Sequence, residues 1–151
     1  MPVAVQEKAP AKSQLAFITE NDLVLIKAGA RQVKFAPGDI LIKQDSPGGA
    51  MFFLRSGSAR IETNGVTLTR LGPGQICGEV AFLDSRHSSA SVVAEHEIEA
   101  DVIDWAELHR IFRMFPHVGA RFYQSMAVLL SGRLRETSAR LADCQCGKIR
   151  R

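Results

Sequence analysis

The sequence predicts an α+β domain: an eight-stranded antiparallel jelly-roll β-barrel with an N-terminal helix and C-terminal helices. Two observations favour this fold class. Between residues 31 and 103, short apolar or alternating segments are separated by Gly, Pro, Asn and Asp at intervals of about 8 to 12 residues, which is typical of sandwiches and barrels. Before and after this region, apolar residues recur at helical spacing.

Bulk composition favours a single non-membrane domain. The chain has 151 residues, 46% of them hydrophobic and 23% charged, which is ordinary for a globular protein with a proper core. A net charge of +3 is too small to predict nucleic-acid binding. No apolar run approaches 18 residues, so no membrane span is expected. Residues 1–14 carry no signal-peptide core and are expected to form a disordered arm. The missing signal and the odd number of cysteines favour a cytoplasmic location.

The N-terminal helix begins at a capping box. Thr19 is predicted as the N-cap, with Asp22 at the reciprocal position and Leu23 and Ile26 on one face. Gly29 is expected to end this helix. The residues that follow alternate with a period of two, so the chain changes from helix to strand near residue 31.

Turn residues divide the central region into strands. The Asn64–Gly65 dipeptide predicts a type I′ hairpin turn. The expected strands cover residues 32–35, 40–42, 51–54, 59–62, 66–69, a short segment at 76, 91–94 and 97–103. Together they form a predicted β-roll over about residues 31–103.

Helical spacing returns over about residues 104–141. Asp104 is predicted to cap a first helix, with Glu107 at the reciprocal box position, and Pro116 ends it. The next helix is expected over about residues 117–141, and residues 142–151 are expected to form a polar basic tail. The apolar stripe of the helix at 117–141 contains Phe122, Met126, Leu129, Leu130, Leu134 and Leu141.

The most informative segment is residues 78–94, GEVAFLDSRHSSASVVA. Gly78 allows a sharp turn and close approach of a ligand to the backbone. Glu79 places a carboxylate just inside that turn. Residues 81–83 open a short helical turn, and its free N–H groups suit a phosphate.

This segment resembles the phosphate-binding cassette of cyclic-nucleotide-binding domains. That cassette carries Gly-Glu, small and apolar residues, then an Arg, one residue, and an Ala leading into a strand. The resemblance rests on Gly78, Glu79, Ala81, Leu83, Ala90 and the strand at 91–94, and the order of elements extends it to residues 15–141. It implies the β-roll fold of catabolite-activator-like proteins, a regulatory or signalling role, and Glu79 as acceptor of the ribose 2′-hydroxyl.

One position departs from the family pattern. Counting back from Ala90, the phosphate-binding Arg falls on Ser88, while Arg86 lies two residues too early. Loss of a charge-assisted hydrogen bond costs about 1.5 to 3 kcal/mol, or one to two decades of affinity. The predicted ligand-binding residues are Gly78, Glu79, Val80, Ala81, Arg86, Ser88, Ser89 and Ala90.

Three readings of this cassette stay open. The leading hypothesis is a stand-alone, non-enzymatic module that binds cyclic AMP or cyclic GMP weakly or not at all, with no other cofactor. The alternative is a functional cyclic-nucleotide sensor, in which Glu79 binds the ribose and Arg86 binds the phosphate. A third is reuse of the pocket for another small molecule.

No residue pattern predicts an enzyme or a metal site. The four histidines are not spaced as metal ligands, and no Ser-His-Asp or Cys-His set is tied to an exposed turn. Cys77 is expected to be a buried filler, and Cys144 and Cys146 form a poor zinc site. The ten residues after Leu141 are too few for a helix-turn-helix, so no DNA-binding domain is expected. A homodimer through the C-terminal helix and an unknown protein partner complete the expectations.

Overall fold

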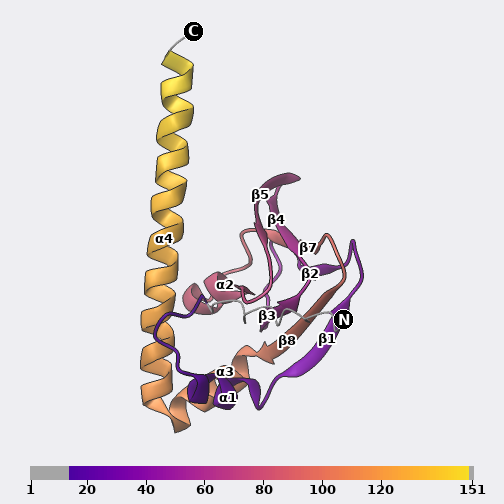
Figure 1. The fold of residues 1–151 in the computed structure, drawn as a ribbon, viewed down its shortest axis with the longest axis vertical. Coiled ribbons are helices and arrows are strands. Elements are labelled where there is room, and N and C mark those ends of the chain that lie inside the picture. Colours follow the sequence, from indigo (N-terminus) through magenta and orange to yellow (C-terminus); the bar gives the residue numbers. More distant parts are fainter. Residues whose placement is uncertain (1–13, 150–151) are drawn as a thin grey trace, which may run out of the picture.

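The structure, a computed structural model, describes residues 14–149 and has the predicted jelly-roll fold, with two four-stranded antiparallel sheets and flanking helices (Figure 1). The first sheet contains β1 (Arg31–Phe35), β8 (Ile98–Asp104), β3 (Ala50–Ser56) and β6 (Ile76–Cys77), in that order. The second sheet contains β2 (Ile40–Ile42), β7 (Ser91–Ala94), β4 (Ala59–Thr63) and β5 (Val66–Leu71). The helices are α1 (Glu20–Lys27), α2 (Glu79–Asp84), α3 (Trp105–Met114) and α4 (Pro116–Ile149).

The predicted turn between β4 and β5 is confirmed. Asn64 and Gly65 have φ angles of 51° and 77°, so both central residues are left-handed, as a type I′ turn requires. Strand β4 then pairs with β7, where Arg60 lies opposite Val93 and Ile61 lies opposite Val92. This pairing places the β4–β5 hairpin beside β7, the strand that ends the segment resembling the cassette.

Helix α1 begins at the predicted capping box and is joined to α4 through it. Thr19 Oγ1 accepts a hydrogen bond from the Asp22 N–H, and the Thr19 N–H donates to the Asp22 carboxylate, each at 3.1 Å. The same buried carboxylate accepts two hydrogen bonds of 2.6 Å from the Arg121 guanidinium on α4. The Arg121 hydrogen bonds hold the pKa of Asp22 well below its usual range.

Two apolar clusters make the core. One lies inside the β-roll and contains Phe52, Leu54, Val92, Ile98 and Val102 among others. The other joins the helices to the first sheet, and aromatic rings dominate it: Phe122 packs on Phe112 with ring centroids 5.0 Å apart and on Phe82 at 6.0 Å. Because Phe82 belongs to α2, the helix core holds the cassette segment in place.

The predicted capping box of α3 is wrong. Asp104 occupies the N-cap position but makes no side-chain cap hydrogen bond. Its carboxylate instead accepts a 3.2 Å hydrogen bond from Arg31 on β1, and Glu107 pairs with Arg110 one turn along the helix. Both carboxylates bind arginines instead of backbone N–H groups of the helix, because a hydrogen bond between two ions is stronger than one to a neutral N–H.

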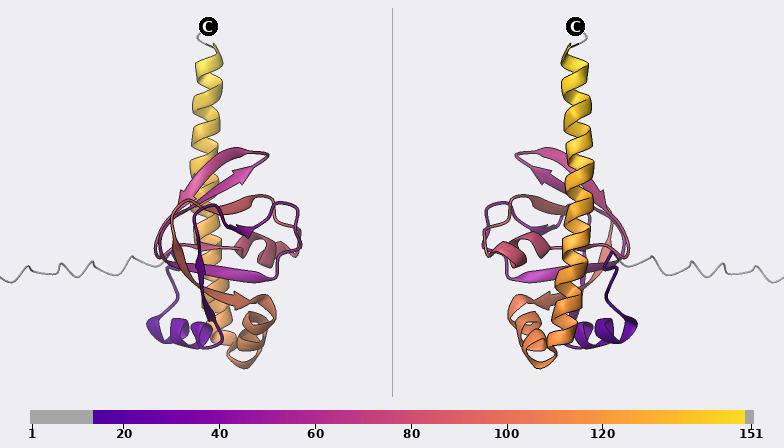
Figure 2. Two further views of the ribbon diagram at one scale, coloured as in Figure 1. Left: turned by 90° about the vertical axis from the view of Figure 1, so that its right-hand side faces the viewer. Right: turned by 90° about the vertical axis from the view of Figure 1, so that its left-hand side faces the viewer.

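Helix α4 lies along one side of the β-roll and extends well beyond it (Figures 1 and 2). It continues to Ile149 rather than ending near Leu141, since residues 142–146 contain no glycine or proline that would stop it. Its inner half, residues 116–130, buries Val118, Phe122 and Met126. We call residues 131–149 the outer half of α4. Of its side chains up to residue 147, all are exposed except Arg133.

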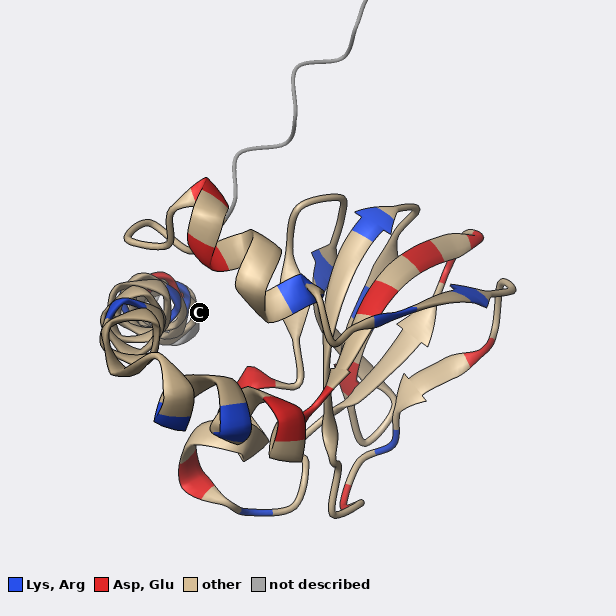
Figure 3. Cartoon of the chain, turned by 90° about the horizontal axis from the view of Figure 1, so that it is seen from below, with Lys and Arg blue, Asp and Glu red and all other residues tan. Residues whose placement is uncertain are grey.

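Charges of both signs are interspersed over the helices and strands when α4 is seen end-on (Figure 3). No helix within residues 14–149 has the length and apolar character that spanning a membrane requires. Across the same residues, no group of three or more His, Cys, Asp or Glu side chains is placed to hold a metal ion. The predicted arm over residues 1–14 and the end of the predicted tail at 150–151 lie almost entirely outside the described residues.

Candidate functional site

The turn at Gly78 sets the geometry of the site. Gly78 has a φ of 90° and is the N-cap of α2. A Cβ at this position would lie 2.6 Å from the carbonyl oxygen of Ala50, closer than van der Waals contact allows. Only glycine therefore fits between the cassette segment and β3. The turn directs Glu79 inward, and its residue surface is only 3% exposed.

A small cavity of about 100 Å³ opens beside Glu79. Its lining residues are Ile42, Ile61, Cys77, Gly78, Glu79, Val80, Ala81, Ser88, Ser89, Ala90 and Val92. All the predicted binding residues except Arg86 therefore meet around one cavity. A wider hollow of about 510 Å³ adjoins it and shares the walls formed by Ile42, Gly78 and Ser88.

Ser88 is fixed at the wall of the cavity by its backbone. Its N–H donates to the Ser46 carbonyl at 2.9 Å, and its own carbonyl accepts from the Asp45 N–H at 2.8 Å. The residue is 9% exposed. A side chain at this position therefore starts from a rigid backbone and borders the same cavity as Glu79.

Arg86 lies on the outside of the loop. It is exposed and is not among the residues that line the cavity. Its backbone N–H donates to the Asp84 carboxylate at 3.0 Å, which forms a local turn just after α2. The structure thus brings Ser88 and Glu79 together and leaves Arg86 apart from them.

Sequence reasoning missed one residue of the site, Arg133. Its guanidinium Nη1 contacts Glu79 Oε1 from α4. The Glu79 side chain is 4% exposed and the Arg133 side chain 32% exposed, so the carboxylate is buried and its partner reaches it from the surface. The spacing along α4 could have indicated this residue. Arg133 follows Leu129 by four residues and therefore continues the face of α4 that packs on the β-roll.

Cys77 is the buried filler that the sequence predicts. Burial raises the pKa of its thiol, and the nearby negative charge of Glu79 raises it further. The thiol is therefore neutral at physiological pH and is a poor nucleophile and a poor metal ligand. It contributes an apolar surface to the cavity and no chemistry.

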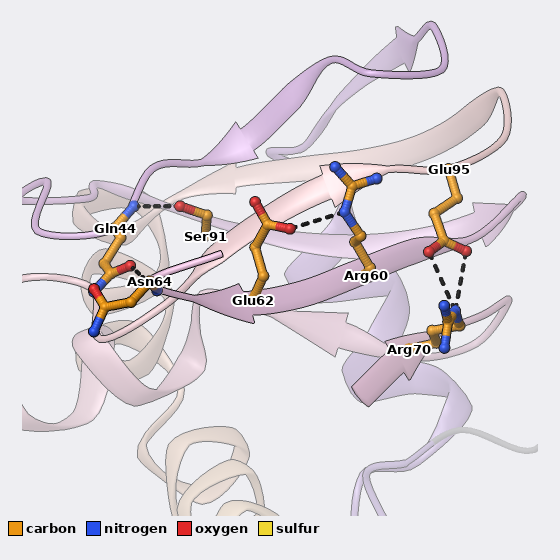
Figure 4. A network of polar contacts seen from close by, with 7 residues as sticks. All are labelled: Gln44, Arg60, Glu62, Asn64, Arg70, Ser91 and Glu95. Atoms are coloured by element: carbon orange, nitrogen blue, oxygen red, sulfur yellow. Dashed lines mark hydrogen bonds and ion pairs between the residues drawn. The ribbon is translucent and has the colours of Figure 1, made fainter. Parts of the chain in front are cut away.

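A network of polar contacts joins strands and loops of the second sheet (Figure 4). The Gln44 N–H donates to Ser91 Oγ at 2.8 Å, and the Gln44 side chain pairs with Asn64 at the tip of the β4–β5 hairpin. Arg60 pairs with Glu62 within β4, and Arg70 pairs with Glu95 just after β7. The contacts of Gln44 join the β2–β3 loop to the hairpin and to the first residue of β7.

The cavity offers a ligand both polar and apolar contacts. The cavity offers one buried carboxylate, serine residues and the first turn of α2 to a ligand, surrounded by aliphatic side chains. No lysine or arginine lines it among the described residues. Its lining also contains no histidine to act as a base for a serine or cysteine nucleophile.

Comparison with known proteins agrees with this geometry. Residues 32–114 match the profile of the "Cyclic nucleotide-binding domain". Cyclic GMP-binding protein C of Dictyostelium discoideum is 26% identical over 124 residues, 78% of this chain and 5% of that protein. The cyclic AMP receptor protein of Thermus thermophilus is 30% identical over 112 residues, 71% of this chain and 50% of that protein. The chain therefore spans at most half the length of these curated relatives.

Solved structures show the same fold. The catabolite activator protein of Thermus thermophilus superposes with a TM-score of 0.72 at 28% identity, over 86% of this chain and 62% of that one. The profile match covers more than half of the chain. It runs from the second residue of β1 to the end of α3 and contains the turn at Gly78, Glu79 and the loop that holds Ser88. This chain belongs to the cyclic nucleotide-binding domain family.

Proposed function

We propose that this chain is a non-enzymatic regulatory module of the family whose affinity for cyclic AMP and cyclic GMP is weak. The observation that carries the proposal is the lining of the cavity, where Ser88 stands at the expected position of the phosphate-binding Arg and where no lysine or arginine is found among the described residues. Lys43 lines only the adjoining hollow. Glu79, the expected acceptor of the ribose 2′-hydroxyl, is buried at the wall of the same cavity, which supports the ligand class. Relatives described as cyclic GMP-binding and cyclic AMP receptor proteins support the ligand class.

Charge and size both weaken binding. A cyclic phosphodiester keeps its negative charge when it leaves water, and a serine hydroxyl offers no charge-assisted hydrogen bond in return. A cavity of about 100 Å³ is also below the roughly 300 to 1,000 Å³ of ordinary ligand pockets. A nucleotide would therefore extend into the adjoining hollow or require the walls to move. We expect a dissociation constant no tighter than about 100 micromolar.

Calorimetric titration with both nucleotides, on the parent chain and on Ser88→Arg, tests the proposal. The substitution places a guanidinium at the cavity wall, two residues before Ala90, and should raise affinity by at least about tenfold. His87→Arg is the matched control, since it adds a positive charge to the same loop at an exposed residue outside the cavity lining. It should change affinity much less.

Two results would contradict the proposal. A low-micromolar dissociation constant for the parent chain would show that the pocket is not weakened, and Arg86→Ala would then test whether Arg86 binds the phosphate. An absence of gain in a folded Ser88→Arg variant would show that something other than the missing cation limits binding.

The output of the module is proposed to be its own association through α4. Leu134 and Leu141 are 68% and 61% exposed on the outer half of α4. An apolar stripe on a projecting helix seldom stays exposed in a monomer, and a self-complementary helix face favours a two-fold dimer. A protein partner that responds to this dimer is part of the same proposal.

A further inference from the structure

We propose that the wider hollow next to the cavity is a second ligand site, which takes a small monocarboxylate with an aromatic or aliphatic body. The hollow lies between the β2–β3 loop and the start of α3, and Lys43, Pro47, Phe52 and Trp105 are among its lining residues. We call it the Trp105 hollow. Its volume of about 510 Å³ falls within the roughly 300 to 1,000 Å³ of ordinary ligand pockets. The site goes beyond the proposed function, because it does not require a nucleotide.

The indole nitrogen of Trp105 is a buried donor without an acceptor. Within residues 14–149, Trp105 Nε1 is the one buried side-chain nitrogen or oxygen that has no hydrogen-bond partner. An unpaired buried donor is unfavourable, and the N–H of a buried tryptophan usually finds an acceptor. A ligand oxygen in the Trp105 hollow supplies the acceptor that this N–H lacks.

Contacts on several sides position the ring at the wall of the hollow. The backbone N–H of Trp105 donates to the Gly49 carbonyl at 2.9 Å, and the ring packs edge-on against Phe82 with centroids 6.0 Å apart. A Cβ at Gly48 would lie 2.7 Å from Cη2 of the ring, so only glycine lets the loop pass this close. Because the residue lines the hollow while its nitrogen is buried, a small rotation of the ring brings the N–H to a ligand acceptor.

Lys43 gives the hollow an unpaired positive charge. Its side chain is exposed and forms no ion pair with the residues that the structure describes. Asp104 is the acidic residue of the lining, and Arg31 already pairs with its carboxylate at 3.2 Å. The charge that is left for a ligand is therefore positive, which favours an anion.

The walls and the two donors together select a monocarboxylate. Leu41, Pro47 and Phe52 present apolar surface to the body of a ligand. A carboxylate has two oxygens, so one can accept from Trp105 Nε1 and the other from the Lys43 ammonium. A phosphate dianion would leave acceptors unpaired against apolar walls and would lie near the Asp104 carboxylate. A single carboxylate on an apolar body matches both the number of donors and the walls.

The Trp105 hollow and the cavity beside Glu79 differ in the groups that they offer. Glu79 lines the cavity and not the hollow, whereas Lys43 and Trp105 line the hollow and not the cavity. Each site can therefore be altered by a substitution that leaves the lining of the other intact.

The single tryptophan of the chain makes a specific test possible. The ¹⁵N-labelled full chain has one indole N–H resonance, and titration with 3-phenylpropionate should shift it to saturation with a dissociation constant of about 1 mM. The neutral 3-phenylpropan-1-ol keeps the same skeleton without the charge and should bind at least about fivefold more weakly. The cation 3-phenylpropylamine should leave the resonance unmoved.

Substitutions with a matched control identify the two donors. Lys43→Gln should weaken 3-phenylpropionate binding about threefold to tenfold, since the lysine is exposed and its charge is partly screened. Arg55→Gln removes an equally exposed positive charge outside the lining of the hollow and should leave affinity unchanged. Trp105→Phe keeps an aromatic ring without the donor and should weaken binding about tenfold, measured by saturation-transfer NMR on the ligand. If Trp105→Phe does not fold, Lys43→Gln with its control still decides.

Glu79→Gln separates the two sites, because it keeps the shape of the cavity wall and removes its charge. Unchanged affinity for 3-phenylpropionate in this variant supports the hollow. A loss in Glu79→Gln without a loss in Lys43→Gln would place the ligand in the cavity and overturn the proposal.

Two further results would contradict the site. If 3-phenylpropionate leaves the indole resonance of the parent chain unmoved, the hollow is not a carboxylate site. Equal affinity for the acid and the alcohol would show that the apolar walls alone bind the ligand and that the assigned class is wrong. Neither result affects the titrations with cyclic AMP and cyclic GMP, so this site and the proposed function are tested separately.

Discussion

Helix α4 pairs two arginines with two buried acids, and the two pairs lie in different surroundings. On its inner half, Arg121 binds both oxygens of Asp22, next to the buried rings of the helix core. On its outer half, Arg133 contacts Glu79 beside the cavity, where the surrounding helix is exposed. The two pairs are buried to the same extent, so what distinguishes them is the cavity that borders Glu79 and not Asp22.

The largest expected difference between the two halves is in apolar packing. Phe122→Ala should lower the free energy of unfolding by about 3 to 5 kcal/mol, since a fully buried ring would leave a cavity. Leu134→Ala removes an exposed side chain and should change it by less than about 0.5 kcal/mol. Urea unfolding followed by circular dichroism measures both. A cost above 1 kcal/mol for Leu134→Ala at low protein concentration would show that the outer half packs on the β-roll after all.

The next difference is between the ion pairs. Arg121→Gln leaves the Asp22 carboxylate buried without its partner, and a 35% exposed arginine side chain moderates the loss to about 2 kcal/mol. Arg133→Gln should cost less, about 1 kcal/mol, because Glu79 lines a cavity that is large enough to hold water beside the freed carboxylate. Urea unfolding of both variants, with Arg135→Gln as the control, measures the two losses in free energy of unfolding. Equal losses would mean that the Glu79 pair is as structural as the Asp22 pair.

Acid should weaken the inner pair, Asp22 with Arg121. The native pKa of Asp22 is depressed, chiefly by the Arg121 hydrogen bonds, while the unfolded value is about 3.9. A depressed native pKa contributes stability that is fully present above about pH 5 and is lost as pH falls below 4 toward the native value. Asp22→Asn should therefore flatten the fall in stability between about pH 5 and pH 2. Urea unfolding across that range measures it, and an unchanged slope would contradict the assignment.

The smallest expected effect on stability, with the largest on assembly, is at Leu134. Leu134→Glu should split the proposed dimer and leave the β-roll folded, because the side chain is exposed within one chain. Sedimentation velocity at tens of micromolar measures this. If the parent chain already sediments as a monomer, the stripe on the outer half has another partner and the dimer proposal is wrong.

Local signals in the sequence were enough for the fold class and for most of the site. Thr19 with Asp22 fixed the start of α1, and Asn64 with Gly65 fixed the turn of the β4–β5 hairpin, because caps and type I′ turns depend on neighbouring residues. Gly78, Glu79, Ser88 and Ala90 meet at one cavity for the same reason, since a short segment of chain places them.

Only the tertiary structure decided which charges meet. Asp104 and Glu107 match a capping box in sequence, yet Arg31 from β1 binds one and Arg110 binds the other. Arg133 lies far from Glu79 in sequence, and Arg86 is closer to it, but packing of the α4 stripe brings Arg133 to the carboxylate and leaves Arg86 outside. A charged side chain binds the partner that the fold brings within reach, and its energy depends on burial, which sequence spacing does not measure.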